Sequence, residues 1–305
     1  NWQPIGPFGN AIANSTRARG RVNTVLVDPV NPNTIYMGTP AGGIWKSING
    51  GGNWIPLSDN LPQIGISGIA VDPNNASVIY ISTGDTDAND TYSVGVLKST
   101  DGGATFTKIS EWAGTTGQYV HADIHNMAWY DNGNKLLVTT DGGLFYSVNK
   151  GTNFSDKNTG LRLKQFYGVA IHPTSTNYFL AGAQDNGTHQ FNGPGLTSSI
   201  EVLGGDGGYT AIDQDEPQFQ TGAYVYANFR RTTNGGSTWS SSGSANSSGL
   251  FINPYDYDNI NNKVYAGYSA GQFLRWENPQ SGFTLNPVSI TEFGTASVAS
   301  TTVSP

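Results

Sequence analysis

The side chains best suited to chemistry gather in short polar segments between apolar strands. The sharpest is HADIH (His121–His125), which carries two histidines and a carboxylate at alternate positions. A strand's period of two predicts that His121, Asp123 and His125 share one face. Residues two apart lie about 7 Å apart, so two of the three could bind one zinc ion, but hardly all three. The other interpretation is that the histidines hydrogen-bond neighbouring strands and rigidify them.

Three further carboxylates follow strands and lie next to glycines. Asp141 lies in TTDGG, Asp185 and Asn186 lie in GAQDNGT, and Asp206 lies in GGDGGY. Each segment alone is typical of a turn. Together with Asp123, the three aspartates are also candidates for the paired carboxylates of a glycosidase, which stand about 5 to 10 Å apart across a sugar.

A loop rich in acidic residues is a candidate calcium site. In DTDAN, Asp85, Asp87 and Asn89 match the first, third and fifth ligand positions of a calcium loop. The match then fails, because Asp90 stands where an EF-hand needs glycine and Val96 stands where it needs glutamate. A calcium site of another type and a solvated loop both remain open.

A repeated turn indicates the elements that position these residues. The turn combines a hydroxyl residue, a turn-forming polar residue, glycine and an aromatic residue, and it occurs in SINGGGNW (Ser47–Trp54), STDGGATF (Ser99–Phe106), SVNKGTNF (Ser147–Phe154) and TTNGGSTW (Thr232–Trp239). Glycine supplies positive φ and Asp or Asn bonds the loop backbone, so each copy predicts a tight turn between antiparallel strands.

The turns belong to a longer repeat of four short apolar runs, each rich in Val, Ile and Tyr. Equivalent strand-ending positions recur about every 40 to 60 residues, which is typical of a β-propeller. These positions are Asp28, Asp72, Asp131, His172, Asp213, Asn253 and Ser304.

We therefore expect an all-β protein that forms a single propeller of about seven blades over residues 1–305. Residues 1–20 provide an outer closing strand and lead-in, because NWQPI echoes the NWIPL that follows the first turn. Residues 21–295 form six blades, and residues 296–305 begin a further blade that is incomplete here. Because this blade is incomplete, we expect the natural protein to continue past Pro305.

Propeller topology predicts where a ligand binds. Loops that enter the innermost strand, and loops between the second and third strands, open on one face, opposite the repeated turns. The expected ligand-binding residues on that face are Arg19, Arg21, His121, Asp123, His125, Asp141, Asp185, Asn186 and Asp206. Asp85, Asp87 and Asn89 are expected on the same face as ligands for calcium.

The amino-acid composition excludes several kinds of binding partner and site. The net charge is −7, so no basic surface is available for nucleic acid. Cysteine is absent, which excludes disulfides and cysteine-bound metals. No apolar run is long enough to span a bilayer. The chain starts at Asn1 without a leader, so a processed or excised chain is expected.

The four turns resemble Asp-boxes, which in sialidase-type and sortilin-type propellers join the third and fourth strands of a blade. GRVNTVLVDPVNPNTIYMGT, HADIHNMAW, GLRLKQFYGVAIHP, GAQDNGT and GGDGGYTAID extend the resemblance over the whole chain. The chain thus resembles the sortilin-like, BNR-repeat propellers secreted by Bacteroidota, which are often labelled glycosyl hydrolase. The resemblance implies a propeller, a secreted or cell-surface location, and a type IX secretion signal in a region outside this chain, through which the secretion machinery would be a partner.

Three functions are compatible with these features. The first is a secreted or cell-surface module that binds a glycan or a protein partner at its channel mouth. The second is a glycoside hydrolase similar to the xyloglucanase type, with its acid and base among Asp123, Asp141, Asp185 and Asp206. The third is a rigid scaffold segment of a large surface protein. The binding module is favoured because no complete catalytic set matches a known motif.

Overall fold

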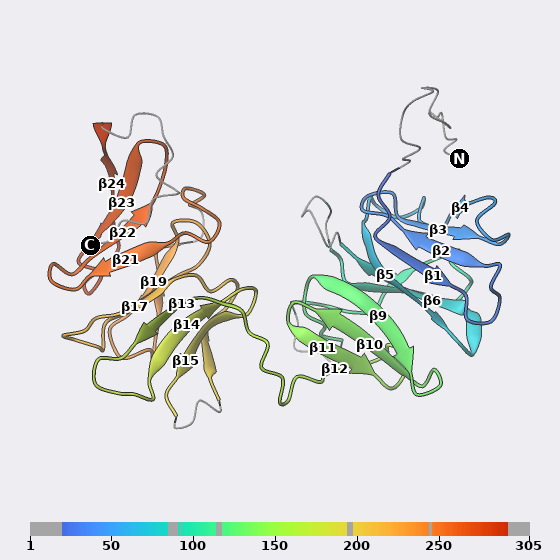
Figure 1. Cartoon of the computed structure of the whole chain (residues 1–305), viewed down its shortest axis with the longest axis horizontal. Helices are drawn as coiled ribbons and strands as arrows, with labels where there is room; N and C mark the ends of the chain where they lie inside the picture. The colour runs from blue at the N-terminus through green and yellow to red at the C-terminus, as the bar shows by residue number, and fades with distance from the viewer. Residues whose placement is uncertain are drawn as a thin grey trace. The chain divides into compact units, whose positions relative to one another are not determined.

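The computed structural model describes residues 20–84, 91, 93–113, 118–193, 198–243 and 246–291. In these ranges the chain forms 24 strands and no α-helix (Figure 1). No helix among them could therefore cross a bilayer. The chain divides into two compact units, Asn1–Leu161 and Arg162–Pro305, and each is described by itself.

The first unit contains three four-stranded antiparallel sheets, each in sequence order. Its strands are β1 (Thr24–Val27), β2 (Ile35–Gly38), β3 (Ile44–Ser47), β4 (Ile55–Pro56), β5 (Ile66–Asp72), β6 (Asn75–Thr83), β7 (Val96–Ser99), β8 (Thr107–Lys108), β9 (Ile124–Tyr130), β10 (Lys135–Thr140), β11 (Gly143–Ser147) and β12 (Ser155–Asp156).

The second unit contains three more four-stranded antiparallel sheets, each again in sequence order. Its strands are β13 (Phe166–Ile171), β14 (Phe179–Ala183), β15 (Gly187–Phe191), β16 (Ile200–Leu203), β17 (Thr210–Ile212), β18 (Gln220–Ala223), β19 (Phe229–Thr232), β20 (Ser240–Ser241), β21 (Tyr255–Asp258), β22 (Lys263–Gly267), β23 (Gln272–Glu277) and β24 (Thr284–Ser289).

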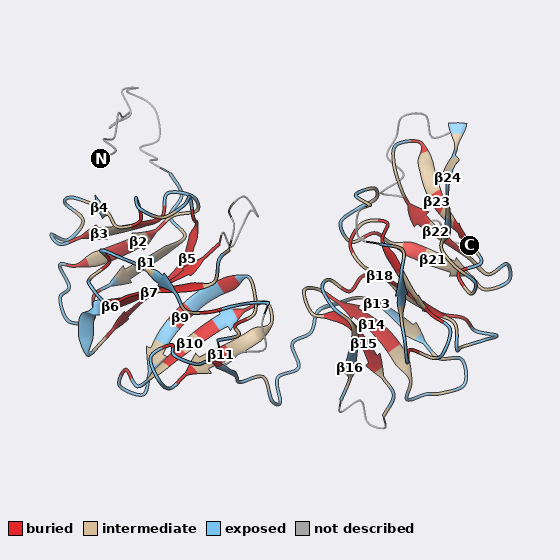
Figure 2. Cartoon of the chain, turned by 180° about the vertical axis from the view of Figure 1, so that it is seen from behind, coloured by how far each residue is buried: buried red, intermediate tan, exposed pale blue. Residues whose placement is uncertain are grey.

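Burial shows how the sheets pack face to face. All seven residues of β5 are buried, because β5 lies between β1 and β9 and both of its faces are covered. One apolar cluster joins the first two sheets through Tyr36, Ile66 and Ile81. A second joins the next pair and includes Tyr80 and Val138. Buried residues accordingly lie mostly along strands, and exposed residues mostly in loops (Figure 2).

The four repeated turns join the third and fourth strands of their sheets with one hydrogen-bond pattern. In Ser99–Phe106, the Ser99 hydroxyl donates to Asp101 Oδ1 and accepts from the Gly103 N–H. Asp101 also accepts from the Thr105 N–H and hydroxyl, and these bonds hold the pKa of Asp101 well below its ordinary value. The other three turns repeat the core of the pattern. The turns therefore lock the outer strand of each of these sheets in register.

The predicted all-β fold of propeller blades is confirmed by these sheets. The predicted number of seven is not, since the described ranges contain six sheets. Residues 1–19 and 292–305, which include Ser304 and most of the residues assigned to a seventh blade, lie outside the described residues.

One strand assignment is wrong. The sequence predicts the first strand of the sixth blade before Asn253, whereas β21 runs over Tyr255–Asp258. Asp258 is the true strand-ending residue, because its Oδ1 accepts the N–H groups of Ile260 and Asn261, as Asp213 does for Asp215 and Glu216. Asn253 is instead a buried residue whose side chain donates to the Gly267 carbonyl. An apolar LFI run that belongs to a loop caused the error.

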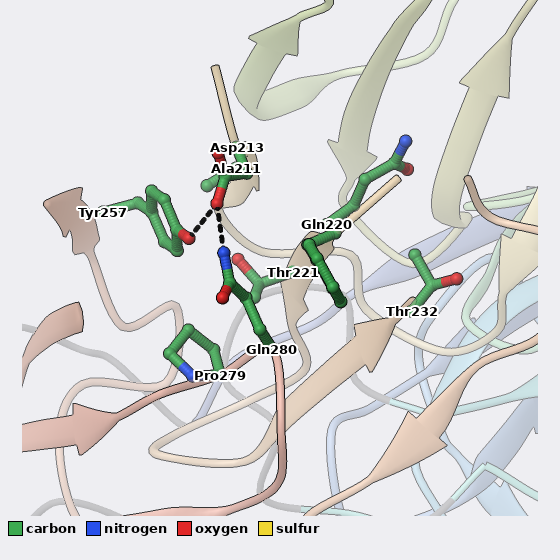
Figure 3. A pocket seen from close by; sticks show the side chains of 9 residues that line it. Ala211, Asp213, Gln220, Thr221, Thr232, Tyr257, Pro279 and Gln280 are labelled. Carbon is green, nitrogen blue, oxygen red and sulfur yellow. Dashed lines mark hydrogen bonds between the residues drawn. The ribbon is translucent and has the colours of Figure 1, made fainter. Parts of the chain in front are cut away.

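Buried strand-ending carboxylates tie two of the sheets to the sheets that follow them. Asp72 is fully buried and accepts a 2.7 Å bond from Lys150, which lies in the next sheet's turn. Asp213 is 2% exposed and accepts bonds from the Tyr257 hydroxyl (2.6 Å) and Gln280 Nε2 (2.8 Å) of the sixth sheet (Figure 3). Burial acts to raise the pKa of Asp213, but the bonds from Tyr257, the Glu216 N–H, Gln280 and the Asp215 N–H outweigh it and hold the pKa low.

The turn analysis gives a first prediction. Gly103→Ala places a side chain at φ 97°, where its Cβ would lie 2.6 Å from Leu57 Cδ1. We expect it to cost about 2 kcal/mol in the free energy of unfolding, measured by urea denaturation. Gly102→Ala is the matched control, since Gly102 also has positive φ but no atom within 4 Å of an added Cβ. Equal losses in both variants would contradict the packing role of Gly103.

The buried Asp213 gives a second prediction. Tyr257→Phe removes one of four bonds to this carboxylate and should cost about 1 to 3 kcal/mol. Because the pKa of Asp213 is lower in the folded than in the unfolded chain, its ionised carboxylate stabilises the folded state above about pH 4. This stability is lost as the pH falls below that value. Because Tyr257→Phe raises the pKa of Asp213, the midpoint of acid unfolding should move to higher pH. Tyr265→Phe in β22 is the control, and a shift of equal size there would contradict the assignment.

Candidate functional site

Most of the predicted site residues that the structure describes lie at one end of their sheets. We call the end at which the first strand of a sheet begins the upper end, and the end that carries the repeated turns the lower end. In the second unit, Thr210 at the start of β17 pairs with Gly222, while Ile212 pairs with Gln220 next to Thr232 of the repeated turn. Residues that precede first strands or join second to third strands therefore lie opposite the turns.

The predicted ligand-binding residues that the structure describes are divided between the two units. Arg21, His121, Asp123, His125 and Asp141 belong to the first unit, and Asp185, Asn186 and Asp206 belong to the second. Arg21 precedes β1 and is exposed. Arg19 and the predicted calcium ligands Asp85, Asp87 and Asn89 lie outside the described residues.

The HADIH segment is not the straight strand that the sequence predicts. β9 begins only at Ile124, and Asp123 has a left-handed φ of 55°. The expectation that His121, Asp123 and His125 share one strand face is therefore wrong, because the backbone turns at Asp123. Non-glycine residues rarely adopt this conformation, and Asp is among those that tolerate it.

His125 and Asp141 form a direct pair in the first unit. His125 Nε2 lies 2.5 Å from Asp141 Oδ1, and both side chains are partly exposed. The pairing of β9 with β10 shifts register between Asn126 and Ile124, so His125 is a bulged residue. A bulge re-aims a side chain, which explains why His125 reaches the loop after β10.

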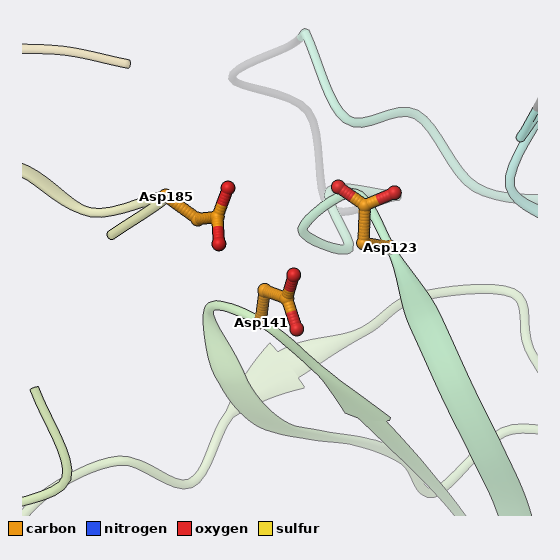
Figure 4. A group of neighbouring side chains, drawn as sticks. All are labelled: Asp123, Asp141 and Asp185. Atoms are coloured by element: carbon orange, nitrogen blue, oxygen red, sulfur yellow. The ribbon is translucent and has the colours of Figure 1, made fainter. Parts of the chain in front are cut away.

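Two other side chains surround this pair. The His121 ring packs on Gly142, where an added Cβ would lie 2.3 Å from His121 Cγ. Asp123 and Asp141 have carboxylate oxygens within 4.8 Å of each other (Figure 4). The two carboxylates could contribute ligands to a cation, or accept bonds from hydroxyl groups of a sugar.

In the second unit, Asp185 and Asp206 come together at the upper end. The Asp185 N–H donates to Asp206 Oδ1 at 3.1 Å, which joins the loop after β14 to the segment before β17. Asp185 has a left-handed φ of 55°. Glycines permit this approach, since an added Cβ at Gly182 would lie 1.8 Å from the Gly208 carbonyl oxygen. The pair is thus built on rigid backbone of two adjacent sheets.

Tyr167 completes the group in the second unit. It occupies a bulge in β13, because Phe166 pairs with Ala183 and Gly168 with Gly182. Burial, and then the charges of Asp206 and Asp185, raise the pKa of Tyr167. Its phenol therefore stays protonated at neutral pH and can donate a hydrogen bond beside two acceptors.

His189 supports the loop that carries Asp185 and Asn186. It is buried in β15, and its Nε2 lies 2.6 Å from the Asn186 carbonyl oxygen while Nδ1 lies 3.1 Å from Ser199 Oγ. Burial lowers the pKa of His189. The contact with the Asn186 carbonyl raises this pKa, and the positive charge of Lys164, whose Nζ lies 2.9 Å from Nε2, lowers it.

Sequence reasoning missed Tyr167 and His189. Aligning the first strands would have indicated Tyr167, since the bulged residues Ser67, His125 and Tyr167 precede Gly68, Asn126 and Gly168 in three successive repeats. No comparable signal marks His189, because a single histidine in a strand is more often a core residue than a support for a loop.

Comparisons with known proteins give limited similarity. No protein-family model matches the chain. It is 32% identical over 105 residues to the xyloglucanase Xgh74A of Acetivibrio thermocellus, and the match covers 32% of this chain and 12% of that protein. The chain thus spans only a small part of this curated relative.

Comparison with solved structures gives low similarity scores. One is the GH74 xyloglucanase from Xanthomonas campestris, with 17% identity, a TM-score of 0.33, and coverage of 88% of this chain and 54% of that one. Another is YCF48 bound to D1 peptide, with 13% identity, a TM-score of 0.34, and coverage of 91% and 83%. At these values the fold assignment depends on the sheets described above.

The environment of His189 gives a third prediction. Its folded pKa is lowered, so the unfolded chain binds a proton first as the pH falls below about 6.5, and stability decreases there. His189→Gln should therefore flatten the dependence of the melting temperature on pH between about pH 7 and 5. His172→Gln, at the lower end of the same sheet, is the control. An unchanged slope in His189→Gln would contradict the assignment.

Proposed function

We propose that this protein is a glycan-binding module that holds a neutral polysaccharide at the upper end of its blades. The observation that carries the proposal is the group of Asp185, Asp206 and Tyr167 in the second unit. The Asp185 N–H donates to the Asp206 carboxylate, which fixes that carboxylate against the loop that carries Asp185, and the charges of both aspartates act on the Tyr167 phenol. Sugars present neighbouring hydroxyl groups that both donate and accept, and this group offers both functions.

The first unit supports the same interpretation independently. Its upper end carries Asp123 and Asp141 with carboxylate oxygens within 4.8 Å, and His125 bonded to Asp141. Fixed polar side chains on bulged or left-handed backbone are typical of binding sites, where such backbone costs of order 1 to 3 kcal/mol. Each unit therefore contributes a polar group of its own.

The sequence similarity favours a glycan over other ligands. The matched relative is a xyloglucanase, which supports xyloglucan as the ligand. The four turns support a relationship to Asp-box propellers, and with it a secreted or cell-surface location. Binding without cleavage is the function proposed, because the described residues supply hydrogen-bond partners without a recognised acid and base pair.

Calorimetric titration with xyloglucan oligosaccharides tests the proposal and is the fourth prediction. The wild type should bind. Asp206→Asn keeps an oxygen acceptor for the Asp185 N–H but loses the charge, so we expect affinity to fall about tenfold with little change in melting temperature. Tyr167→Phe should weaken binding by a smaller factor, because it removes a neutral donor.

The matched control is Asp215→Asn, which alters an exposed carboxylate at the lower end of the same unit. It should bind as the wild type does. Absence of binding by the wild type at millimolar oligosaccharide, or unchanged affinity in Asp206→Asn, would contradict the proposal. Release of reducing ends during incubation would replace it with hydrolysis.

A further inference from the structure

One aromatic residue has a backbone conformation that aromatic residues rarely adopt. Tyr226, in the loop between β18 and β19, has a φ of 58°. Every other described residue with left-handed φ is Gly, Asp or Asn, apart from Lys150. A turn that needed only positive φ would be formed at lower cost by glycine, so the Tyr226 side chain has a reason to be retained.

A buried hydrogen-bond network holds this strained loop. Asn228 is buried, and its Nδ2 donates to the carbonyls of Val225 and Asn246 at 2.8 and 2.7 Å. Its Oδ1 accepts from the Asn246 N–H at 3.1 Å. The Tyr224 N–H also donates to the Asn228 carbonyl at 2.9 Å. The Tyr226 side chain is therefore presented on a preorganised loop.

Phe251 forms the second half of an aromatic corner. The Tyr226 N–H donates to the Phe251 carbonyl at 2.8 Å, and the two rings meet at 90° with centroids 5.7 Å apart. Phe251 is 52% exposed. Its loop is held by buried Asn253, which bonds Gly267, and by the Gly249 N–H, which donates to Tyr268. An exposed ring on a rigid loop is available to a ligand without an ordering cost.

The corner lies at the same end of the second unit as the carboxylate group. The loops of Tyr226 and Phe251 lie at the upper end, since one joins a second strand to a third and the other precedes the first strand β21. Tyr224 packs on Gly205, beside Asp206, because an added Cβ there would lie 2.6 Å from Tyr224 Cε2. Arg230 lies over the Tyr224 ring at 5.4 Å from its centroid.

We propose that Tyr226 and Phe251 form an aromatic subsite that stacks a pyranose ring of a neutral polysaccharide whose next residues contact Asp206 and Asp185. The inference rests on the proposed glycan binding and extends it by one subsite. The C–H groups on the apolar face of a sugar carry partial positive charge and complement the negative face of an aromatic ring. Two rings at a right angle provide one face for stacking and one edge that limits its direction.

Oligosaccharide length provides the decisive test. Short xyloglucan oligosaccharides that occupy only the carboxylate group should bind wild type, Tyr226→Gly and Phe251→Ala equally. Longer ones should gain affinity in the wild type, and each variant should lose about threefold to tenfold of that gain. Tyr226→Phe, which keeps the ring, should retain it.

Stability separates this role from a structural one. Tyr226→Gly relieves the left-handed strain, so its melting temperature should equal or exceed that of the wild type while affinity falls. Ile260→Ala, 91% exposed at the lower end of the same unit, is the control for loss of an exposed apolar side chain.

Two outcomes would overturn the inference, and they differ in what else they affect. If the wild type binds and Asp206→Asn weakens binding, but Tyr226→Gly and Phe251→Ala keep the dependence on length, the aromatic subsite is wrong and the proposed function stands. If the wild type binds no oligosaccharide of any length, both are wrong.

Discussion

A four-stranded sheet of this protein has two apolar faces and can bury them only against another sheet. β5 shows the result most fully, because all seven of its residues are buried between β1 and β9. Strands at the margin of a unit differ: Val25 and Val27 of β1 remain exposed. Stability therefore depends on the contact between successive sheets, and each sheet must be held at a fixed position relative to the next.

The lower end provides that fixation. Asp72 and Asp213 are buried carboxylates that cap the turn after their own strand and bond a side chain of the following sheet. A buried charge without such partners would cost several kcal/mol, so the bonds are obligatory once the carboxylate is buried. Because register and spacing are set there, the loops of the upper end are free to vary, and they hold Asp123, Asp185 and Tyr226 in left-handed conformations.

The regular parts of this arrangement could be predicted from the sequence. Local signals mark the repeated turns, the short strands and the segments of Asp141, Asp185 and Asp206, because glycine pairs and alternating apolar residues act over a few positions. Three features could not be predicted. HADIH and LFINP have strand-like composition, but tertiary contacts turn the first at Asp123 and make the second a loop around buried Asn253. Tyr226 has no local signal, because its loop is held by bonds between Asn228 and the distant Asn246, and its own N–H donates to the Phe251 carbonyl.

The distribution of conformational strain connects the fold to the proposed ligand. At the lower end, left-handed backbone is supplied mainly by glycine and Asn, for example Gly103, Gly236 and Asn262, so the turns there form at little cost. At the upper end glycine again supplies left-handed backbone, for example at Gly143, Gly187 and Gly271, but Asp123, Asp185 and Tyr226 adopt it too, and each adds a functional group to the backbone conformation. Carboxylates and aromatic rings together suit a ligand with both hydroxyl groups and apolar C–H faces, whereas a purely anionic ligand would be repelled by the acidic groups. A neutral sugar chain meets that requirement, and the acidity of the chain, with its net charge of −7, does not oppose it.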